Sequence, residues 1–188
     1  SDLMDSYKDF KLEDFEDNAV GRYLAQGHKI NDLVRAGSMG EYITDTTKVM
    51  DVSDGLDSAI ESAPKLPKGD LFRVISADAV EKLSKNQVIR DKGFMSTTAA
   101  NLFDGSNGKL LLTLATISSG RKAVAIITNN GGRSGLYMPA VKVGQPIAEF
   151  EREVVLPRNT ELKFRGQDYY PMGDGNFLTY YRFERVTP

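Results

Sequence analysis

The sequence predicts an α+β protein in which an N-terminal helical layer, residues 1–65, precedes a mostly antiparallel β-sandwich core, residues 66–188. The first part repeats apolar residues at helical spacing, whereas the second contains short, turn-bounded runs rich in β-branched and aromatic residues. Hydrophobic residues make up 40% of the 188 positions, which suits one domain with a real core. Because the chain does not begin with methionine, we expect a processed form or a domain cut from a longer protein.

The helical layer is predicted to contain three amphipathic segments. In "LEDFEDNAVGRYLAQG", residues 12–27, apolar side chains recur at spacings of three and four residues, and Gly27 is expected to end the helix. The segment "INDLVRAG", residues 30–37, forms one or two further amphipathic turns. "DVSDGLDSAIESAP", residues 51–64, is the third helix, which Pro64 ends because proline cannot continue the backbone hydrogen bonding.

The β core is predicted from short runs whose residues favour strands and which are bounded by turns. Two weakly structured connections, 99–108 and 129–146, separate some of these runs. The second is long for a compact domain, and connections of that length are usually functional or disordered. The expected strands are 71–76, 92–98, 109–117, 122–128, 150–157, 161–166 and 176–186.

The composition excludes several classes of function. The formal net charge is −2, so we expect no binding to nucleic acid through its phosphate backbone. The chain contains no cysteine and a single histidine, His28, which excludes disulfides, thiol nucleophiles, zinc sites and a serine–histidine relay. No apolar run is long enough to span a membrane, and the first residues do not resemble a signal peptide. The chemistry is therefore expected to rest on carboxylates, arginines and hydroxyl groups, without a metal.

Two short stretches place such groups at unusual positions. Arg73 lies in the middle of the apolar run "LFRVIS", where its permanent charge needs a carboxylate or another anion as partner. A core glutamate is the more common partner, and a phosphate held by the planar guanidinium is the functional alternative. Ser96, Thr97 and Thr98 end the next expected strand, where such a run is more often a turn cap than a site.

The third stretch is "EFEREVVLP", in which Glu149, Glu151 and Glu153 occupy alternate positions before an apolar run. In an extended strand, alternate side chains lie on the same face, about 6.5–7 Å apart. We therefore expect two or three carboxylates on one face of a strand, where they repel and raise each other's pKa. Taken alone, the stretch is more simply explained as a charged edge strand that prevents aggregation.

In this order, the three stretches together resemble the mono-ADP-ribosyltransferases of the R-S-E class, which include cholera- and actin-modifying toxins and phage-encoded transferases. Thr98 replaces the serine that is usual in this family but keeps the hydroxyl group. The flanking "INDLVRAG" and "EVVLPRNTELKF" are also similar to the family, and the resemblance covers roughly residues 20–166. The residues that carry it are the pair Phe72-Arg73, the Ser-Thr-Ser-type motif Ser96-Thr97-Thr98 and the Glu-x-Glu motif Glu151-Arg152-Glu153.

The resemblance implies an ADP-ribosyltransferase fold, NAD+ as co-substrate and cleavage of the nicotinamide–ribose bond. Glu153 is expected to stabilise the oxocarbenium-like ribose through its 2′-hydroxyl, with Ser96 as the orienting group. Arg73 is expected to hold the diphosphate, while Phe103 and the backbone of Val74 hold the nicotinamide. The expected NAD+ contacts are therefore Arg73, Val74, Ser96, Thr97, Thr98, Phe103 and Glu153.

The first glutamate of the Glu-x-Glu motif concerns the acceptor. Glu151 can take a proton from an attacking arginine, whereas resembling enzymes that modify asparagine carry a glutamine at this position. We therefore expect an arginine of a host-cell protein as acceptor. The protein would then be a toxin or phage effector, secreted or delivered into the host cytoplasm. The aromatic residue that the family places before this motif is not at its usual offset, which leaves Phe150 or Tyr137 as candidates.

Two alternatives stay open from the sequence. An NAD+ glycohydrolase would use the same Arg73, Ser96 and Glu153 with water as acceptor, but it would not need the second carboxylate of Glu151. A non-catalytic interaction domain that kept the fold is the other alternative. Such a domain would not need to keep all three stretches intact, as they are here.

Overall fold

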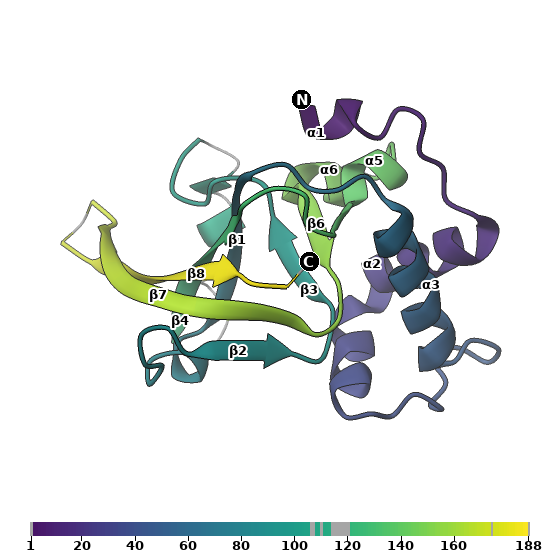
Figure 1. Ribbon diagram of the computed structural model, residues 1–188, viewed down its shortest axis with the longest axis horizontal. Coiled ribbons are helices and arrows are strands. Elements are labelled where there is room, and N and C mark those ends of the chain that lie inside the picture. The colour runs from purple at the N-terminus through teal and green to yellow at the C-terminus, as the bar shows by residue number, and fades with distance from the viewer. Residues whose placement is uncertain (1, 106–107, 110, 114–120, 174, 188) are drawn as a thin grey trace.

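The computed structural model describes residues 2–105, 108–109, 111–113, 121–173 and 175–187. Two long helices pack together beside a mostly antiparallel sheet, and the predicted α+β fold class is confirmed (Figure 1). The helices are α1 (Asp2–Asp5), α2 (Asp14–Arg35), α3 (Val49–Ser62), α5 (Met138–Val141) and α6 (Pro146–Glu151), with a 3-10 turn at Ala77–Ala79. The strands are β1 (Gly69–Ser76), β2 (Val88–Asp91), β3 (Met95–Thr98), β4 (Lys122–Asn129), β5 (Leu136–Tyr137), β6 (Glu153–Leu156), β7 (Thr160–Pro171) and β8 (Phe177–Arg185).

The eight strands form one continuous hydrogen-bonded sheet in the order β2-β7-β8-β4-β1-β3-β6-β5. Neighbouring strands are antiparallel apart from the parallel pair of β4 and β8. Strand β1 pairs with β4 over its whole length, but with β3 only at one register pair, Phe72 with Thr98. The sheet therefore consists of two parts, β2-β7-β8-β4-β1 and β3-β6-β5, which meet at a narrow junction.

Helix α2 starts and bends for local reasons. The Glu16 carboxylate accepts a hydrogen bond from the backbone N–H of Glu13 (2.8 Å), and the acidic first turn suits the positive end of the helix dipole. The helices predicted over 12–27 and 30–37 are one helix with a kink at Gln26, where φ is −139° and ψ is 26°. The predicted end at Gly27 is wrong because the helix resumes there, although the interruption lies at the preceding residue.

The main core lies between the two long helices and the sheet. Helices α2 and α3 approach so closely that a Cβ atom at Gly55 would lie 2.4 Å from the Cβ atom of Ala19, so only glycine fits there. Their apolar faces pack on the sheet within one continuous cluster that includes Leu56 and Phe94. A smaller cluster, on the opposite face of β1 and β4, consists of Phe72, Leu102, Leu112 and Val124.

Two predicted strands differ from the structure. Residues 109 and 111–113 are helical where a strand was predicted over 109–117, because a short apolar run does not distinguish a strand from a buried helix. The rest of that predicted strand, 110 and 114–117, lies outside the described residues. Residues 150–151, predicted as the start of a strand, belong to helix α6. The elements α1, β2, β5 and α5 were not predicted, and the other predicted strands are confirmed.

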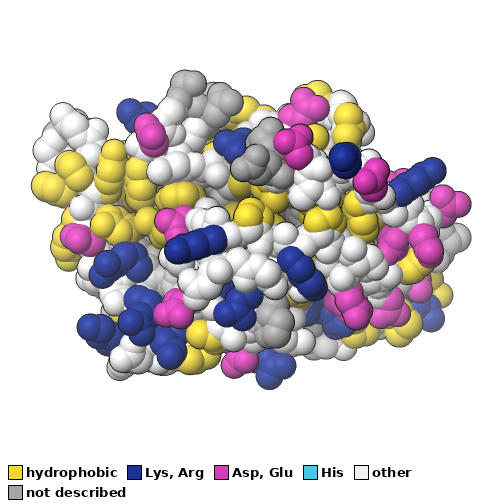
Figure 2. All heavy atoms as spheres, turned by 45° about the horizontal axis from the view of Figure 1, so that its top comes forward, with side chains coloured by type: hydrophobic (Ala, Val, Ile, Leu, Met, Phe, Trp, Pro, Cys, Tyr) yellow, Lys and Arg dark blue, Asp and Glu magenta, His cyan; other side chains and the backbone are white. Residues whose placement is uncertain are grey.

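Charges of both signs are spread over one face of the molecule (Figure 2). Figure 2 shows Lys and Arg side chains interspersed with Asp and Glu over the face in view, and hydrophobic side chains gathered at its left, over the β7–β8 hairpin. Tyr169, Met172 and Phe177 of this hairpin are exposed. In the part of the chain that the structure describes, no helix is long and apolar enough to cross a membrane.

Candidate active site

A cavity of about 200 Å³ lies at the junction between the two parts of the sheet. Strands β1, β3 and β6 each contribute residues to its wall, so the three stretches that are far apart in the sequence come together. All four residues predicted to be catalytic line it, as do three of the other predicted NAD+ contacts. The lining residues are Phe72, Arg73, Val74, Ser96, Thr97, Thr98, Leu102, Leu111, Glu151 and Glu153.

Arg73 enters the cavity from the middle of β1. Strand alternation places it on the same face as Leu71 and Ile75, toward the helical layer, and its Nη1 atom donates to the carbonyl oxygen of Ser96 (2.7 Å). Among the described residues, no carboxylate forms an ion pair with its guanidinium, so the more common explanation, a core ion pair, does not apply. Burial lowers the pKa of Arg73, but an arginine keeps its charge in a protein. The cavity therefore offers a fixed cation to an anion.

The two threonines of β3 attach this strand to the segment that carries the glutamates. Thr97 Oγ1 donates to the carbonyl oxygen of Val154 (2.8 Å) and is buried. Thr98 Oγ1 donates to the carbonyl oxygen of Glu151 (2.6 Å), which holds the end of helix α6. The Thr98 hydroxyl therefore forms a hydrogen bond. Threonine at this position keeps the hydroxyl donor that the usual serine would provide.

Glu153 is the first residue of β6 and lies opposite Thr98 in the β3–β6 register. Burial raises the pKa of Glu153 to about 7. A hydrogen bond from Ser96 and the charge of Arg73 oppose this rise, whereas the nearby carboxylate of Glu151 adds to it. Near neutral pH this carboxylate consequently exists in both protonation states, and its ionised form depends on the groups around it.

Glu151 reaches the same cavity from a helix, so the predicted alternation of Glu149, Glu151 and Glu153 along one strand face is wrong. Glu151 is the last residue of α6, and Arg152 then adopts a left-handed conformation with φ 46° and ψ 46°. This residue turns the chain between helix and strand, so that the two carboxylates converge from different elements. Glu151 is an exposed residue, but partial removal of its carboxylate from water raises its pKa. Glu149 is also exposed and does not line the cavity.

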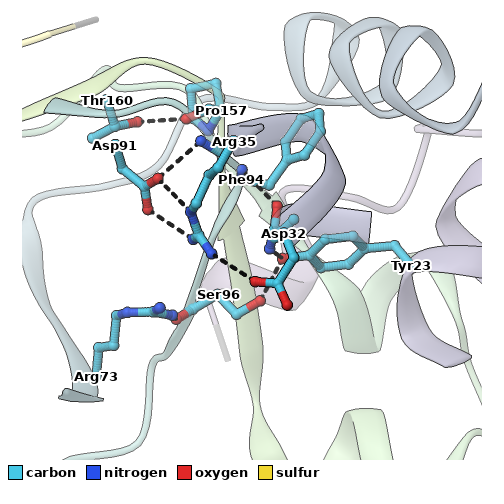
Figure 3. A network of polar contacts seen from close by, with 11 residues as sticks. Tyr23, Asp32, Arg35, Arg73, Asp91, Phe94, Ser96, Pro157 and Thr160 are labelled. Atoms are coloured by element: carbon cyan, nitrogen blue, oxygen red, sulfur yellow. Dashed lines mark hydrogen bonds and ion pairs between the residues drawn. The ribbon is translucent and has the colours of Figure 1, made fainter. Parts of the chain in front are cut away.

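A polar network from helix α2 holds Ser96 (Figure 3). Asn31 accepts a hydrogen bond from the backbone N–H of Phe94 (2.8 Å) and donates one to the hydroxyl oxygen of Tyr23 (2.9 Å). That hydroxyl lies 2.6 Å from the Ser96 hydroxyl. Tyr23, Asn31 and Phe94 are all buried residues.

The same helix also fixes the turn before β3. Arg35 donates two hydrogen bonds to the carboxylate of Asp91, at 2.9 and 3.1 Å, and that carboxylate accepts the backbone N–H of Gly93 (2.8 Å). Figure 3 shows these contacts beside the Tyr23–Ser96 pair. The strand that carries the hydroxyl residues is therefore anchored on α2 at both its turn and its centre.

This network was not predicted from the sequence. Tyr23 was read only as an apolar position of a helix. The available signal was Asn31, a polar residue that lies between Ile30 and Val34 on the buried face of the same helix. A polar side chain on such a face has to form hydrogen bonds, and here its partners lead to the site.

Phe103, which was expected to stack on nicotinamide, does not line this cavity. Its ring is stacked on Tyr170, with centroids 4.3 Å apart and planes at 20°, and it meets the ring of Phe72 edge-on at 6.3 Å. Phe103 lines a larger hollow of about 580 Å³ instead. That hollow contains none of the residues predicted to be catalytic, so its size does not make it the better candidate.

Residues 137–151 include α5, α6 and the two aromatic residues that were candidates for contact with an acceptor. Of the two aromatic candidates there, Tyr137 is buried and its N–H donates to the hydroxyl of Tyr7, whereas Phe150 is partly exposed on α6. Val143 and Ile147, which are 74% and 67% exposed, lie on this same segment. Glu151 of this segment lines the cavity, whereas Ile147 lines a separate hollow beside α2.

Comparison with known proteins gives the following similarities. A sequence profile described as ADP-ribosyltransferase exoenzyme matches residues 4–174. A search of curated protein sequences finds no match. The ADP-ribosylating toxin BECa of C. perfringens, solved with NADH, has a TM-score of 0.72 and 16% identity over 97% of this chain and 46% of its own. C3stau2 from S. aureus, solved with NAD, has a TM-score of 0.69 and 14% identity, and the match covers 100% of this chain and 92% of C3stau2.

A third similar structure is the ADP-ribosyltransferase Vis in complex with the M6 inhibitor. It has a TM-score of 0.70 and 18% identity, covering 99% of this chain and 82% of its own. Vis has also been solved in complex with agmatine, with a TM-score of 0.66. These likenesses agree on the fold, and the profile match extends over most of the chain and includes all three sequence stretches. The protein therefore belongs to the ADP-ribosyltransferase exoenzyme family, which uses NAD+ as its co-substrate.

Proposed function

We propose that the protein transfers a single ADP-ribose unit from NAD+ to an arginine side chain of a protein and releases nicotinamide. The observation that carries this proposal is the convergence of Glu151 and Glu153 on one cavity that also holds Arg73. Family membership supports the use of NAD+. The arginine acceptor is supported by the chemistry of the second carboxylate.

The proposed NAD+ site follows from the size and lining of the cavity. A volume of about 200 Å³ suits the nicotinamide–ribose end but not the whole dinucleotide, so the diphosphate lies at the rim, where Arg73 can bind it. Phe72 and Leu102 provide an apolar wall for nicotinamide, and the backbone of Val74 can meet its amide. Phe103 then acts through its edge-on contact with Phe72.

Bond cleavage creates the charge that the site has to stabilise. The nicotinamide leaves with the electron pair of the bond to C1′, so the ribose becomes an oxocarbenium-like cation. The ionised carboxylate of Glu153 accepts a hydrogen bond from the 2′-hydroxyl and stabilises this cation. Because burial raises the pKa of Glu153 to about 7, the hydrogen bond from Ser96 is needed to favour the ionised form.

Transfer requires a second carboxylate. A nitrogen of the incoming guanidinium forms the new bond to C1′, and its proton passes to the carboxylate of Glu151. An arginine has a pKa above 12, so this proton does not leave before the attack. The Vis structure supports such an acceptor, because agmatine carries the same guanidinium group as arginine. A glycohydrolase that uses water would have no need of Glu151.

We further propose that the target is a protein of a host cell, which the enzyme reaches by secretion or by phage-borne delivery. BECa, whose fold is similar, is described as an ADP-ribosylating toxin and supports a toxin role.

Incubation with isotope-labelled NAD+ and a host-cell lysate tests this function. Labelled proteins are digested, and electron-transfer mass spectrometry locates the modified side chain. We expect adducts on arginine, with the folded Glu153→Gln variant as a control that gives none. Adducts on asparagine, cysteine or a nucleobase would contradict the arginine acceptor, and release of nicotinamide without any adduct would favour the glycohydrolase.

A further inference from the structure

Tyr23 is a buried residue of α2 whose hydroxyl group has two polar partners. Its side chain is 3% exposed, and its ring meets Phe94 edge-on, with centroids 6.0 Å apart. The hydroxyl oxygen lies 2.9 Å from Nδ2 of Asn31 and 2.6 Å from Oγ of Ser96. Because Tyr23 is almost fully buried, we take these two side chains as the partners of its single proton and its lone pairs.

The amide of Asn31 decides the direction of these hydrogen bonds. Its Oδ1 atom accepts the backbone N–H of Phe94, so the NH2 group faces Tyr23 and can only donate. The Tyr23 oxygen is then the acceptor for Asn31, and its own proton is directed to Ser96. Because Ser96 accepts this proton at Oγ, its own proton is left for the Glu153 carboxylate, which lines the same cavity and whose pKa Ser96 lowers.

We propose that Tyr23 is a positioning residue, whose hydroxyl fixes the Ser96 hydroxyl as the hydrogen-bond donor to the Glu153 carboxylate. The opposite direction would use the only proton of Ser96 on Tyr23 and leave none for Glu153. It would also direct the proton of Tyr23 toward the NH2 group of Asn31, which cannot accept it. This inference deepens the proposed function and rests on it for the role of Glu153.

The chain of donors matters because Glu153 has few other groups that favour its charge. The titratable groups that face it are Glu151 from α6, Arg73 from β1 and Tyr23 itself from α2. Of these only Arg73 is a cation. Burial raises the pKa of Tyr23, so its phenol stays protonated and remains a donor. A hydroxyl that accepts a hydrogen bond is also a stronger donor, so Tyr23 strengthens as well as orients the bond from Ser96.

The first test measures the pKa of the Glu153 carboxyl by carbon-13 NMR titration, which requires no turnover. In Tyr23→Phe, which keeps the ring that packs on Phe94, we expect this pKa to rise by about half a unit or more. The matched control is Tyr7→Phe. Tyr7 is also a buried tyrosine, and among the described residues its hydroxyl is hydrogen-bonded to backbone groups of Gly135 and Tyr137. The control is expected to leave the pKa of Glu153 unchanged.

Incorporation of 3-fluorotyrosine at position 23 provides a variant of nearly the same shape. Fluorine makes the phenol a stronger donor, so we expect the pKa of Glu153 to fall. This measurement keeps the inference testable if Tyr23→Phe does not fold. An unchanged pKa of Glu153 in either folded variant would overturn it.

The second test is a double-mutant cycle on nicotinamide release. Tyr23→Phe is expected to lower kcat roughly fivefold to tenfold and to move the acid side of the pH profile toward higher pH. In a Ser96→Ala background the same change is expected to have little further effect, because Tyr23 acts through Ser96. Equal effects in both backgrounds would show that Tyr23 acts on folding or on NAD+ directly and would refute the positioning role. An inactive parent would refute the proposed function, while the NMR titration would still decide on the donor chain.

Discussion

The two glutamates of the cavity are held in different ways. Glu153 begins a strand within the sheet, and it shares the cavity with Ser96, whose hydroxyl lies against Tyr23 of helix α2. Glu151 ends the six-residue helix α6, is exposed, and is fixed through its backbone carbonyl by Thr98. In the proposed function, cleavage of NAD+, which is common to every acceptor, falls to the side of Glu153, which we call the rigid side because the sheet holds it. The side of Glu151, which we call the exposed side, meets the acceptor.

The residues around the two glutamates also differ in burial and polarity. Around Glu153, buried polar groups are paired with one another, as in the contact between Tyr23 and Asn31. Around Glu151, the short helix presents Ile147 and Phe150 outward. We infer that the rigid side determines the charge and position of the reacting ribose, and that the exposed side selects what attacks it.

Loss of the carboxylate on the rigid side is expected to have the largest effect. Glu153→Gln should lower both nicotinamide release and protein modification by roughly a thousandfold, because both reactions pass through the same cation. Assays of the two products on one protein preparation check this, with circular dichroism as the control for folding. If the folded variant kept most of its hydrolysis of NAD+, the role assigned to Glu153 would be wrong.

Arg73 provides the next test of the rigid side. Arg73→Ala should weaken NAD+ binding by about 2–3 kcal/mol, on the order of a hundredfold in Kd, because a phosphate loses its charged partner. Arg73→Lys should restore little of this, since a point charge does not reproduce the planar fork. Isothermal titration calorimetry gives the Kd values. An unchanged Kd in Arg73→Ala would mean that this arginine serves only the strand contact with Ser96.

The raised pKa of Glu153 also has a consequence for stability. The folded protein binds this proton more tightly than the unfolded chain, so between about pH 4.5 and 7 the free energy of unfolding falls as the pH rises. Glu153→Gln removes this cost and should be more stable than the parent by about 2–3 kcal/mol at pH 8, but by much less at pH 5. Urea unfolding at both pH values measures the difference. Glu149→Gln, at an exposed position on α6, serves as the matched control for the loss of one formal charge. A loss of stability at pH 8 would show that the carboxylate is not strained by burial.

Much of the rigid side could be predicted from the sequence. Strand alternation and an arginine within an apolar run placed Arg73 correctly on β1, and the three-residue hydroxyl run does end β3. These features depend on local pattern, which a sequence shows directly. The hydrogen bonds between Tyr23, Asn31 and Ser96 could not be predicted, because they join side chains that only the tertiary fold brings together.

The exposed side was predicted less well. The alternation of glutamates suggested a strand, but the turn at Arg152 has a left-handed conformation that a non-glycine residue seldom adopts. Residues 111–113 were taken as part of a strand because their apolar character does not reveal that Leu112 packs in a small cluster with Phe72. In both places tertiary contacts override the local preference of the chain.

The most direct test of the division between the two sides is Glu151→Gln, assayed for nicotinamide release without acceptor and for arginine modification with it. We predict that NAD+ hydrolysis by this variant stays within about threefold of the parent, because Glu153 still stabilises the cation. Arginine modification should fall by roughly a hundredfold or more. Glu149→Gln, on the same helix, should change neither rate. An equal loss of both reactions in Glu151→Gln, or modification of arginine at the full rate, would contradict the division of labour between the two carboxylates.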